Sequence, residues 1–194
     1  MTTPTAKATK ELTKAQLQPN LGLYWNQDSD DVRNVTIRDG KLLIAGSPGR
    51  VAAVTENTFV TTGPGNIEYR FEPQTASSRP RLVETRPSAE PLIFTAVEEF
   101  KPSAMDLTQY NGRYRSDELD PVYTIVGKGD KLFFLRQKFP DAEIKPTVRD
   151  VFTANGRNWR FVRDSKGAVA GMALKQSRTQ NILFVKEIPS ATVK

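Results

Sequence analysis

Residues 158–163 read NWRFVR, and ninety positions earlier residues 68–72 read EYRFE. In the later stretch Trp159 and Phe161 alternate with Asn158 and Arg160. A period of two residues is typical of a β-strand with one buried face, because successive side chains on a strand point to opposite sides. The stretch therefore predicts a half-buried strand with Trp159 and Phe161 facing a core, and its earlier counterpart predicts a second strand of the same kind.

The match at an offset of ninety positions extends over most of the chain, which makes the repeat the first feature to interpret. Only the middle needs a gap, where Phe59 matches Phe152 at an offset of ninety-three. We interpret the pattern as an internal duplication. The identical pairs include Leu17 and Leu107, Gly22 and Gly112, Tyr24 and Tyr114, Val32 and Val122, Leu42 and Leu132, Phe71 and Phe161, and Phe94 and Phe184.

Each copy contains eight short segments of strand-like pattern separated by turn residues such as Asp39-Gly40 and Asn155-Gly156. Closing such strands into a barrel removes exposed sheet edges. The sequence therefore predicts an all-β fold made of two tandem small antiparallel eight-stranded barrels. The expected strands are 22–26, 32–38, 41–45, 51–55, 58–61, 67–72, 81–86 and 92–97 in the first copy, and 112–115, 122–126, 131–136, 143–149, 151–153, 158–163, 169–175 and 182–186 in the second.

The expected organisation follows from the repeat: a linker over 1–16, a first barrel over 17–98, a linker over 99–105, a second barrel over 106–188 and a tail over 189–194. No apolar run approaches the roughly 20 residues of a membrane-spanning helix, so we expect no membrane span. The first 17 residues lack the apolar core of a signal peptide. Either the chain is cytoplasmic, or its export signal lies outside this sequence.

The chain contains no His and no Cys. These absences exclude disulfides, thiolate metal sites, a Cys nucleophile and the commonest general base and zinc ligand. Neither Ser-x-x-Lys nor Gly-x-Ser-x-Gly occurs, so no Ser nucleophile has a partner. The acidic loops 28–31 and 117–120 match no EF-hand spacing and are interpreted as solvated, with a calcium-like cation as the weaker alternative. We expect no catalytic residue, no cofactor and no metal site.

Charge is divided unevenly between the copies. Residues 127–186 hold thirteen Lys and Arg against five Asp and Glu, whereas residues 17–100 hold eight against eleven. The basic second copy indicates nucleic acid, an anionic surface or an acidic protein as partner, with Trp159, Phe139 and Phe152 available for stacking. The outward halves of alternating strands explain the same pattern without any partner. The candidate binding residues are Lys128, Arg136, Lys138, Arg157, Arg160, Lys175 and Arg178.

Several motifs of the second copy occur together: Leu107-x-x-Tyr110-x-Gly112-x-Tyr114, then GKGDKL at 127–132, Phe152, and WRFVRDSKG at 159–167. This combination resembles the lipocalin-like domain found C-terminal to the catalytic domain of serine β-lactamase-like hydrolases, the group of penicillin-binding-protein-like esterases and D-aminopeptidases. The resemblance covers residues 17–187, and the first copy departs from it at Leu21, where the motif prefers Tyr.

The resemblance implies two lipocalin-like barrels in tandem, as in D-aminopeptidase, with a periplasmic or extracellular location. It also implies an accessory role, since the catalytic Ser-x-x-Lys and Tyr-x-Asn of the family belong to a domain without counterpart in this sequence. The leading hypothesis is a non-catalytic module that packs against a hydrolase catalytic domain, in cis or in trans, and modulates it. The alternatives are a barrel that binds a small hydrophobic ligand, and a basic module that binds nucleic acid or an anionic surface.

The ligand-binding alternative conflicts with one expectation. Barrels of eight short strands are usually filled by their own side chains. The side chains expected to plug the second barrel are Trp159, Phe161, Phe133 or Phe134, Phe152 and Phe184.

Overall fold

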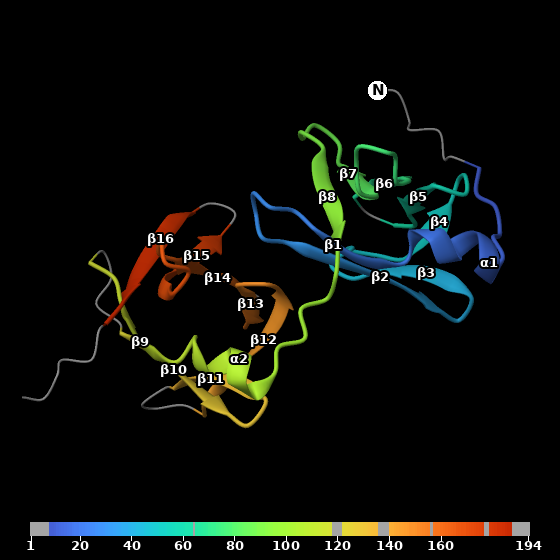
Figure 1. Cartoon of the computed structure of the whole chain (residues 1–194). Helices are drawn as coiled ribbons and strands as arrows, with labels where there is room; N and C mark the ends of the chain where they lie inside the picture. The colour runs from blue at the N-terminus through green and yellow to red at the C-terminus, as the bar shows by residue number, and fades with distance from the viewer. Residues whose placement is uncertain are drawn as a thin grey trace, which may run out of the picture. The chain divides into compact units, whose positions relative to one another are not determined.

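The computed structural model describes residues 8–63, 65–117, 122–135, 140–155, 157–176 and 179–187, and for 175, 176 and 179–181 it describes the backbone alone. The chain divides into two compact units, Met1–Glu98 and Glu99–Lys194. Each unit is an eight-stranded antiparallel barrel-like sheet (Figure 1), which confirms the predicted all-β fold with two tandem barrels. In the described part of the chain, no helix is long and apolar enough to cross a membrane.

The first unit is a nearly closed barrel. Its strands follow the order β3-β2-β1-β8-β7-β6-β5-β4, so that β3 and β4 form the two edges of the sheet. A short helix and a turn of 3₁₀-helix precede them. The elements are α1 (Lys14–Leu17), η1 (Gln18–Asn20), β1 (Gly22–Trp25), β2 (Val32–Arg38), β3 (Lys41–Ile44), β4 (Val51–Ala53), β5 (Thr58–Thr61), β6 (Glu68–Glu72), β7 (Arg81–Thr85) and β8 (Leu92–Val97).

The second unit is a closed barrel, in which β9 pairs with both β10 and β16. Every strand therefore has two neighbours, and the sheet has no edge. The elements are α2 (Ala104–Thr108), β9 (Gly112–Arg115), β10 (Tyr123–Lys128), β11 (Lys131–Leu135), β12 (Ala142–Val148), β13 (Val151–Ala154), β14 (Arg157–Arg163), β15 (Val169–Gln176) and β16 (Thr179–Lys186).

A capped helical turn begins each unit. Thr13 and Ser103 each accept a hydrogen bond from the backbone three residues later, and the side chain at that position bonds back to the cap. Such capping boxes stabilise short helices whose first N–H groups would otherwise lack partners. The two turns place Leu17 and Leu107, which are partners in the repeat, in the buried cores of their barrels.

A tyrosine anchors the first strand of each barrel in the same way. The Tyr24 hydroxyl donates to the Asn20 carbonyl at 3.2 Å, and the Tyr114 hydroxyl donates to the Tyr110 carbonyl at 2.7 Å. Burial raises the pKa of both hydroxyls above the ordinary tyrosine value. This shared bond shows that the duplication preserves individual contacts as well as strand order.

The segment before α1 packs along the edge of the first barrel. The Lys10 amide donates to the Ala53 carbonyl on β4 at 2.8 Å. Leu12 is half-buried against the first core, and the Glu11 carboxylate lies 4.0 Å from the Lys41 ammonium at the start of β3. Residues 9–12 therefore line the seam between the two edge strands, together with parts of β3 and β4.

Candidate ligand-binding site at one end of the second barrel

A cavity of about 340 Å³ opens at one end of the second barrel. The antiparallel order places the starts of β10, β12 and β14 and the ends of β11 and β13 at this end. We call the cavity the mouth pocket. It is lined by Tyr123, Phe134, Ala142, Ala154, Asn155, Arg157 and Trp159.

Three aromatic rings form the wall of the mouth pocket. Tyr123 lies 5.5 Å from Phe134 and 5.2 Å from Trp159, and Phe134 lies 4.8 Å from Trp159, all between ring centroids. The planes are tilted or nearly perpendicular, the geometry that brings the positive edge of one ring toward the negative face of another. The wall is therefore aromatic and largely apolar.

Two alanines leave the space that the aromatic side chains do not fill. Ala142 pairs with Phe134 across β11 and β12, and Ala154 ends β13; both side chains are buried. Larger residues at these inward positions would occupy the cavity. The plug expected from the sequence is present in the buried core as Phe134, Phe152, Trp159, Phe161 and Phe184, and the cavity lies beside it.

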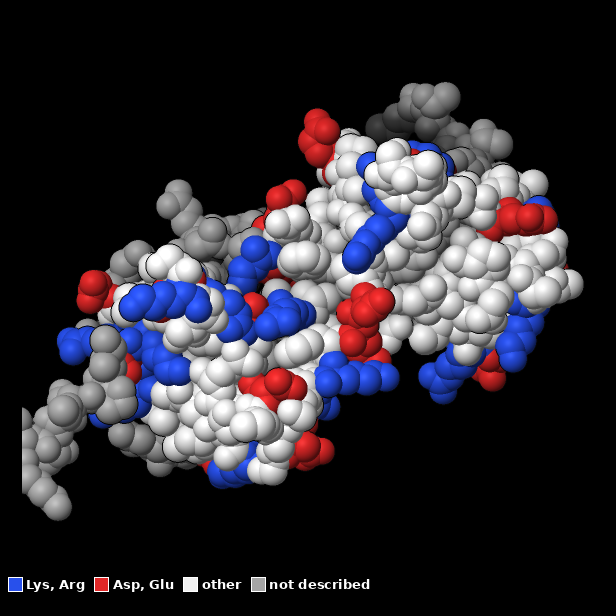
Figure 2. All heavy atoms as spheres, in the orientation of Figure 1, with Lys and Arg blue, Asp and Glu red and all other residues white. Residues whose placement is uncertain are grey.

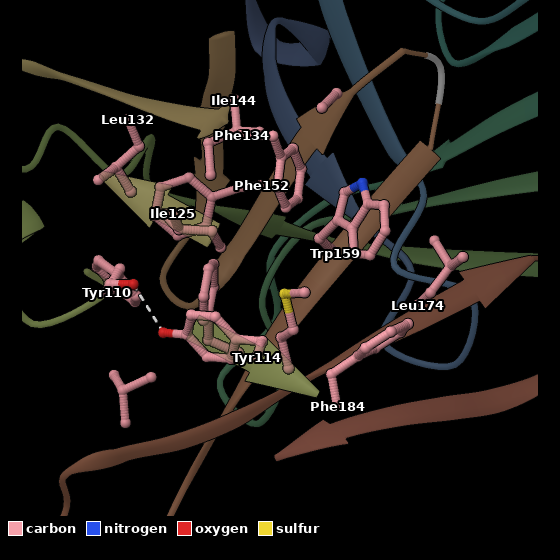
Figure 3. Close-up of a cluster of buried hydrophobic side chains, with 14 of the residues drawn as sticks. Tyr110, Tyr114, Ile125, Leu132, Phe134, Ile144, Phe152, Trp159, Leu174 and Phe184 are labelled. Carbon is pink, nitrogen blue, oxygen red and sulfur yellow. Dashed lines mark hydrogen bonds between the residues drawn. The ribbon is translucent and has the colours of Figure 1, made fainter. Parts of the chain in front are cut away.

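The Trp159 side chain carries a buried polar atom at this end of the barrel. Trp159 is 4 % exposed, and its Nε1 has no hydrogen-bond partner within the described structure. Figure 3 shows the indole nitrogen on the edge of the ring nearest the β13–β14 turn. Native proteins leave few buried N–H groups without an acceptor, so this donor calls for an explanation.

The rim of the pocket is polar. Arg157 is the first residue of β14 and is exposed; it lies two residues before Trp159, and alternation places both side chains on the inner face of the barrel. Asn155 stands beside it in the β13–β14 turn with φ of 51°, a left-handed conformation that Asn tolerates well. The mouth pocket thus combines a wall of aromatic rings with a cationic rim.

An ion pair occupies the corresponding end of the first barrel. The ninety-residue offset matches Tyr123 with Arg33 and Leu174 with Glu84. The Arg33 Nε donates to Glu84 Oε2 at 2.9 Å, and the two side chains are 8 % and 0 % exposed. The Arg86 Nε donates to the other carboxylate oxygen at 2.7 Å. Charged groups therefore occupy the places that Tyr123 and Leu174 hold in the second copy.

Two aromatic residues surround this ion pair. The Arg33 guanidinium lies 4.7 Å from the centroid of Phe94, within the range of a cation–π contact. Tyr69 is the counterpart of Trp159, and its pKa is raised, mainly by burial and further by the Glu84 carboxylate, while Ser47, Arg33 and Arg86 oppose the rise. Both copies therefore place a buried aromatic residue with a polar group at this end.

A second polar cluster lies at the opposite end of the second barrel. Asp150 accepts bonds from the Tyr110 hydroxyl at 2.8 Å and from Arg163 Nε and Nη2 at 2.9 and 2.6 Å. Burial opposes ionisation of Asp150, but the bonds from Arg163 and Tyr110 together hold its pKa below the ordinary value. Arg163 also donates to the Gly167 carbonyl. The cluster ties the turn after α2, the β12–β13 turn and the end of β14 together.

The basic residues singled out in the sequence are dispersed. Arg157 lines the mouth pocket. Lys128 lies on the outer surface, where its ammonium is 2.6 Å from the Asp141 carboxylate, and Arg160 is half-buried on the outward side of β14. Figure 2 shows basic side chains gathered over β14, β15 and β16, with acidic ones between them. Arg136, Lys138, Arg178 and the side chain of Lys175 lie outside the described residues.

The sequence interpretation did not select Tyr123, Ala142, Ala154 or Asn155. Comparison of the copies gave a signal for Tyr123, whose counterpart in the first copy is the charged Arg33. Ala142 and Ala154 lie one residue outside the strands expected over 143–149 and 151–153, and the structure places them at buried positions of β12 and β13. Asn155 was assigned to a turn, which is where it lies.

In the part of the chain that the structure describes, no group of three or more acidic side chains is arranged to hold a metal ion. Of the two acidic loops, residues 118–120 lie outside that part. No protein-family model matches the chain, and no curated protein matches it significantly.

Proposed function

We propose that the second barrel binds a small apolar ligand built around an aromatic ring, and that the mouth pocket holds it. One observation carries the proposal: a cavity of about 340 Å³ with a wall of three aromatic rings lies at the open end of a closed barrel. Small-molecule sites are typically concave, mostly apolar cavities of roughly 300–1,000 Å³ with a few polar groups. The mouth pocket falls at the small end of that range.

The first barrel supports the proposal by contrast. The two copies share one sequence pattern, yet the Arg33–Glu84 ion pair fills this end of the first barrel. The second has Tyr123 and Leu174 at these positions and retains small residues at Ala142 and Ala154. Transfer of an apolar ligand from water to such a surface has a favourable free energy.

The test fills the cavity from within. Ala154→Leu and Ala142→Leu add three carbons each to the pocket, and Thr153→Leu adds a leucine on the outward side of β13 as the matched control. We expect 2-naphthol to bind the native chain by calorimetry and to raise its melting temperature. Both alanine variants should lose this binding and the control should keep it. No heat of binding and no stabilisation of the native chain would overturn the proposal.

We infer a second candidate function from the outer face of the second barrel. Val162, Leu183 and Val185 are 38 %, 48 % and 57 % exposed, and Gly171 stands between Val162 and Val185 in the strand register. Exposed aliphatic groups side by side on a sheet are typical of surfaces that dock other proteins. Together with the motif resemblance, this face supports the accessory role beside a serine β-lactamase-like catalytic domain.

The accessory role is tested by mixing the chain with such a catalytic domain. We expect association by analytical ultracentrifugation, and loss of association in the double variant Leu183→Ser, Val185→Ser. Leu43→Ser, an exposed leucine of the first barrel, serves as the control. Absence of association, with unchanged activity and stability of the catalytic domain, contradicts this second function.

A further inference from the structure

We infer that the seam of the first barrel, between the edge strands β3 and β4, binds an extended segment of a partner protein. This segment takes the place of residues 9–12, which we call the strap. It pairs with β4 and carries an acidic residue between two apolar ones. The inference concerns the first barrel and is independent of the mouth pocket.

The seam is an opening that the second barrel lacks. The repeat matches β3 with β11 and β4 with β12. In the second barrel these strands pair directly, with Leu132 opposite Ile144. In the first barrel β3 and β4 stand at the two ends of the strand order, and the strap lies along them (Figure 1). The first barrel therefore keeps strand edges at the place where the second barrel closes.

The edge of β4 offers backbone groups in the register of a strand. The Val54 amide, directly after β4, donates to the Thr58 carbonyl on β5. Because the backbone groups of successive residues point to opposite sides of a strand, those of Ala53 and Val51 turn toward the seam. The Ala53 carbonyl accepts a bond from the Lys10 amide at 2.8 Å, and these two residues form an antiparallel bridge.

The strap uses only the first of these positions. An antiparallel strand with Lys10 opposite Ala53 would bring Leu12 opposite Val51. The bridge instead stays isolated, because Thr13 caps α1 and the chain enters the helix. A segment of another chain has no such helix to enter, so it can extend the pairing to Val51. Main-chain hydrogen bonds of this kind supply the affinity when a peptide adds a strand to a sheet edge.

A cavity along the seam selects the side chains of the partner. Directly opposite residues of antiparallel strands share a face, and both Val51 and Ala53 are buried. The partner's residues at the positions of Lys10 and Leu12 therefore point toward the core. Lys10 is exposed and Leu12 only half-buried, so apolar side chains at both positions would fill space that the strap leaves open. This space, about 80 Å³, lies between the strap and core residues that include Leu17, Leu42 and Phe59.

A lysine selects the residue between these two positions. The Glu11 carboxylate lies 4.0 Å from the Lys41 ammonium at the start of β3, and both side chains are exposed. An acidic residue of the partner would occupy the same place. Exposed ion pairs contribute little to affinity, so this contact mainly favours one register over others. The strap itself is held by such a pair, one backbone bond and one half-buried leucine, which makes it displaceable.

A synthetic peptide tests the pairing with β4. The capped heptapeptide KTIELTK presents isoleucine, glutamate and leucine at the positions of Lys10, Glu11 and Leu12. Methylation of its isoleucine amide removes the N–H that would bond to Ala53. Methylation of its glutamate amide, which points away from β4, is the matched control. In calorimetry we expect the first change to weaken binding roughly tenfold and the second by less than about twofold.

Two variants test the strap and the charge. Leu12→Ser loosens the strap, so the peptide should bind this variant roughly three- to tenfold more tightly than the native chain. Met105→Ser, at an exposed position of the second unit, should bind the peptide like the native chain. Lys41→Glu should reverse the preference for KTIELTK over KTIKLTK. Lys131→Glu, the same change at the matching position of the second barrel, should leave that preference unchanged.

Amide hydrogen exchange locates the bound peptide. The Val51 amide should exchange more slowly in its presence, and the amides of β14 should not change. Absence of binding to both the native chain and Leu12→Ser would overturn the inference, as would equal affinity for the two methylated peptides. Slowed exchange confined to the second unit would place the peptide elsewhere and overturn it as well.

Discussion

At the scale of single residues, Asp150 is a carboxylate that the fold needs in its ionised form. Its two oxygens accept three hydrogen bonds, from Tyr110 and Arg163. Bonds from a cation are about twice as strong as neutral ones and weaken when the acceptor is protonated. Asp150 occurs at φ of 65° in the tight β12–β13 turn, so the same residue also shapes the backbone.

We predict that this carboxylate makes the stability of the second barrel depend on pH. Its pKa is lowered in the folded state from the ordinary 3.8. The stabilisation is therefore complete above the unfolded pKa and is lost as the pH falls through the folded pKa. Asp150→Asn should lower the free energy of unfolding by about 1–3 kcal/mol at pH 7, and the difference from the native chain should shrink between about pH 5 and pH 2.

Hydrogen exchange of the slowest β13 and β14 amides as a function of pH measures this difference for the second unit alone. Asp130→Asn, which changes an exposed Asp in the β10–β11 turn, is the control. A difference between Asp150→Asn and the native chain that stays constant down to pH 2 contradicts the assignment.

At the scale of elements, the two barrels close differently. The second closes through the pairing of β9 with β16, whereas the first leaves β3 and β4 as edges. Residues 9–12 lie along that seam, with Lys10 bonded to β4 and Leu12 packed on the core. Exposed strand edges invite pairing with other chains, and natural proteins commonly cover them.

We predict that Lys10→Pro loosens the seam, because proline has no amide hydrogen to donate to Ala53. The loss of one hydrogen bond should cost about 0.5–1.5 kcal/mol. Amide exchange should accelerate in β4 and β5 and stay unchanged in β14 and β15. Ala8→Pro, two residues earlier, is the control. Equal exchange of β4 in the two variants would show that the Lys10 bond does not hold the seam.

The strands could be predicted from the sequence because their causes are local. Alternation and turn residues placed all sixteen strands to within a few residues of the observed bounds. Helix α2 was not predicted, although Ser103 and Asp106 form the spacing of a capping box. Five residues are too few for a helical period to be visible, so the cap was the only signal.

The candidate site could be predicted only in part, because its causes are not local. Arg33 and Glu84 stand 51 positions apart, and sequence alternation does not say that two inward charges meet. In the same way, the sequence shows Ala142 and Ala154 only as ordinary core residues. The cavity beside them depends on which side chains the neighbouring strands supply. The repeat helped because it marked the positions at which the two copies differ.

At the scale of the whole molecule, the two barrels share one strand pattern but differ at the corresponding end. One is filled by an ion pair and the other by aromatic rings around a cavity. Removing one partner of a buried ion pair typically costs 3–5 kcal/mol, whereas replacing both by packed apolar residues is often neutral or stabilising.

We predict that the residues of the second copy are tolerated in the first only as a pair. Glu84→Leu leaves Arg33 buried without its carboxylate and should lower the stability of the first unit by about 3–5 kcal/mol. The double variant Arg33→Tyr, Glu84→Leu should recover most of that loss. Denaturant titration followed by hydrogen exchange in β6 and β7 measures both.

Glu72→Leu provides the comparison, since it removes the more exposed pairs with Arg70 and Arg81 and should change the stability by no more than about 1 kcal/mol. If the double variant is no more stable than Glu84→Leu, the two positions do not act as a pair.

The contrast between these two ends also bears on how the chain folds. Tandem copies of one fold are prone to exchange equivalent strands, because each copy offers its twin a nearly correct partner. If β2 entered the second barrel in place of β10, the Arg33 guanidinium would arrive among aromatic rings with Leu174, not Glu84, opposite. An unpaired charge in that position is strongly unfavourable. The ion pair thus disfavours the exchange of β2 for β10, because only the first barrel provides Arg33 with its carboxylate partner.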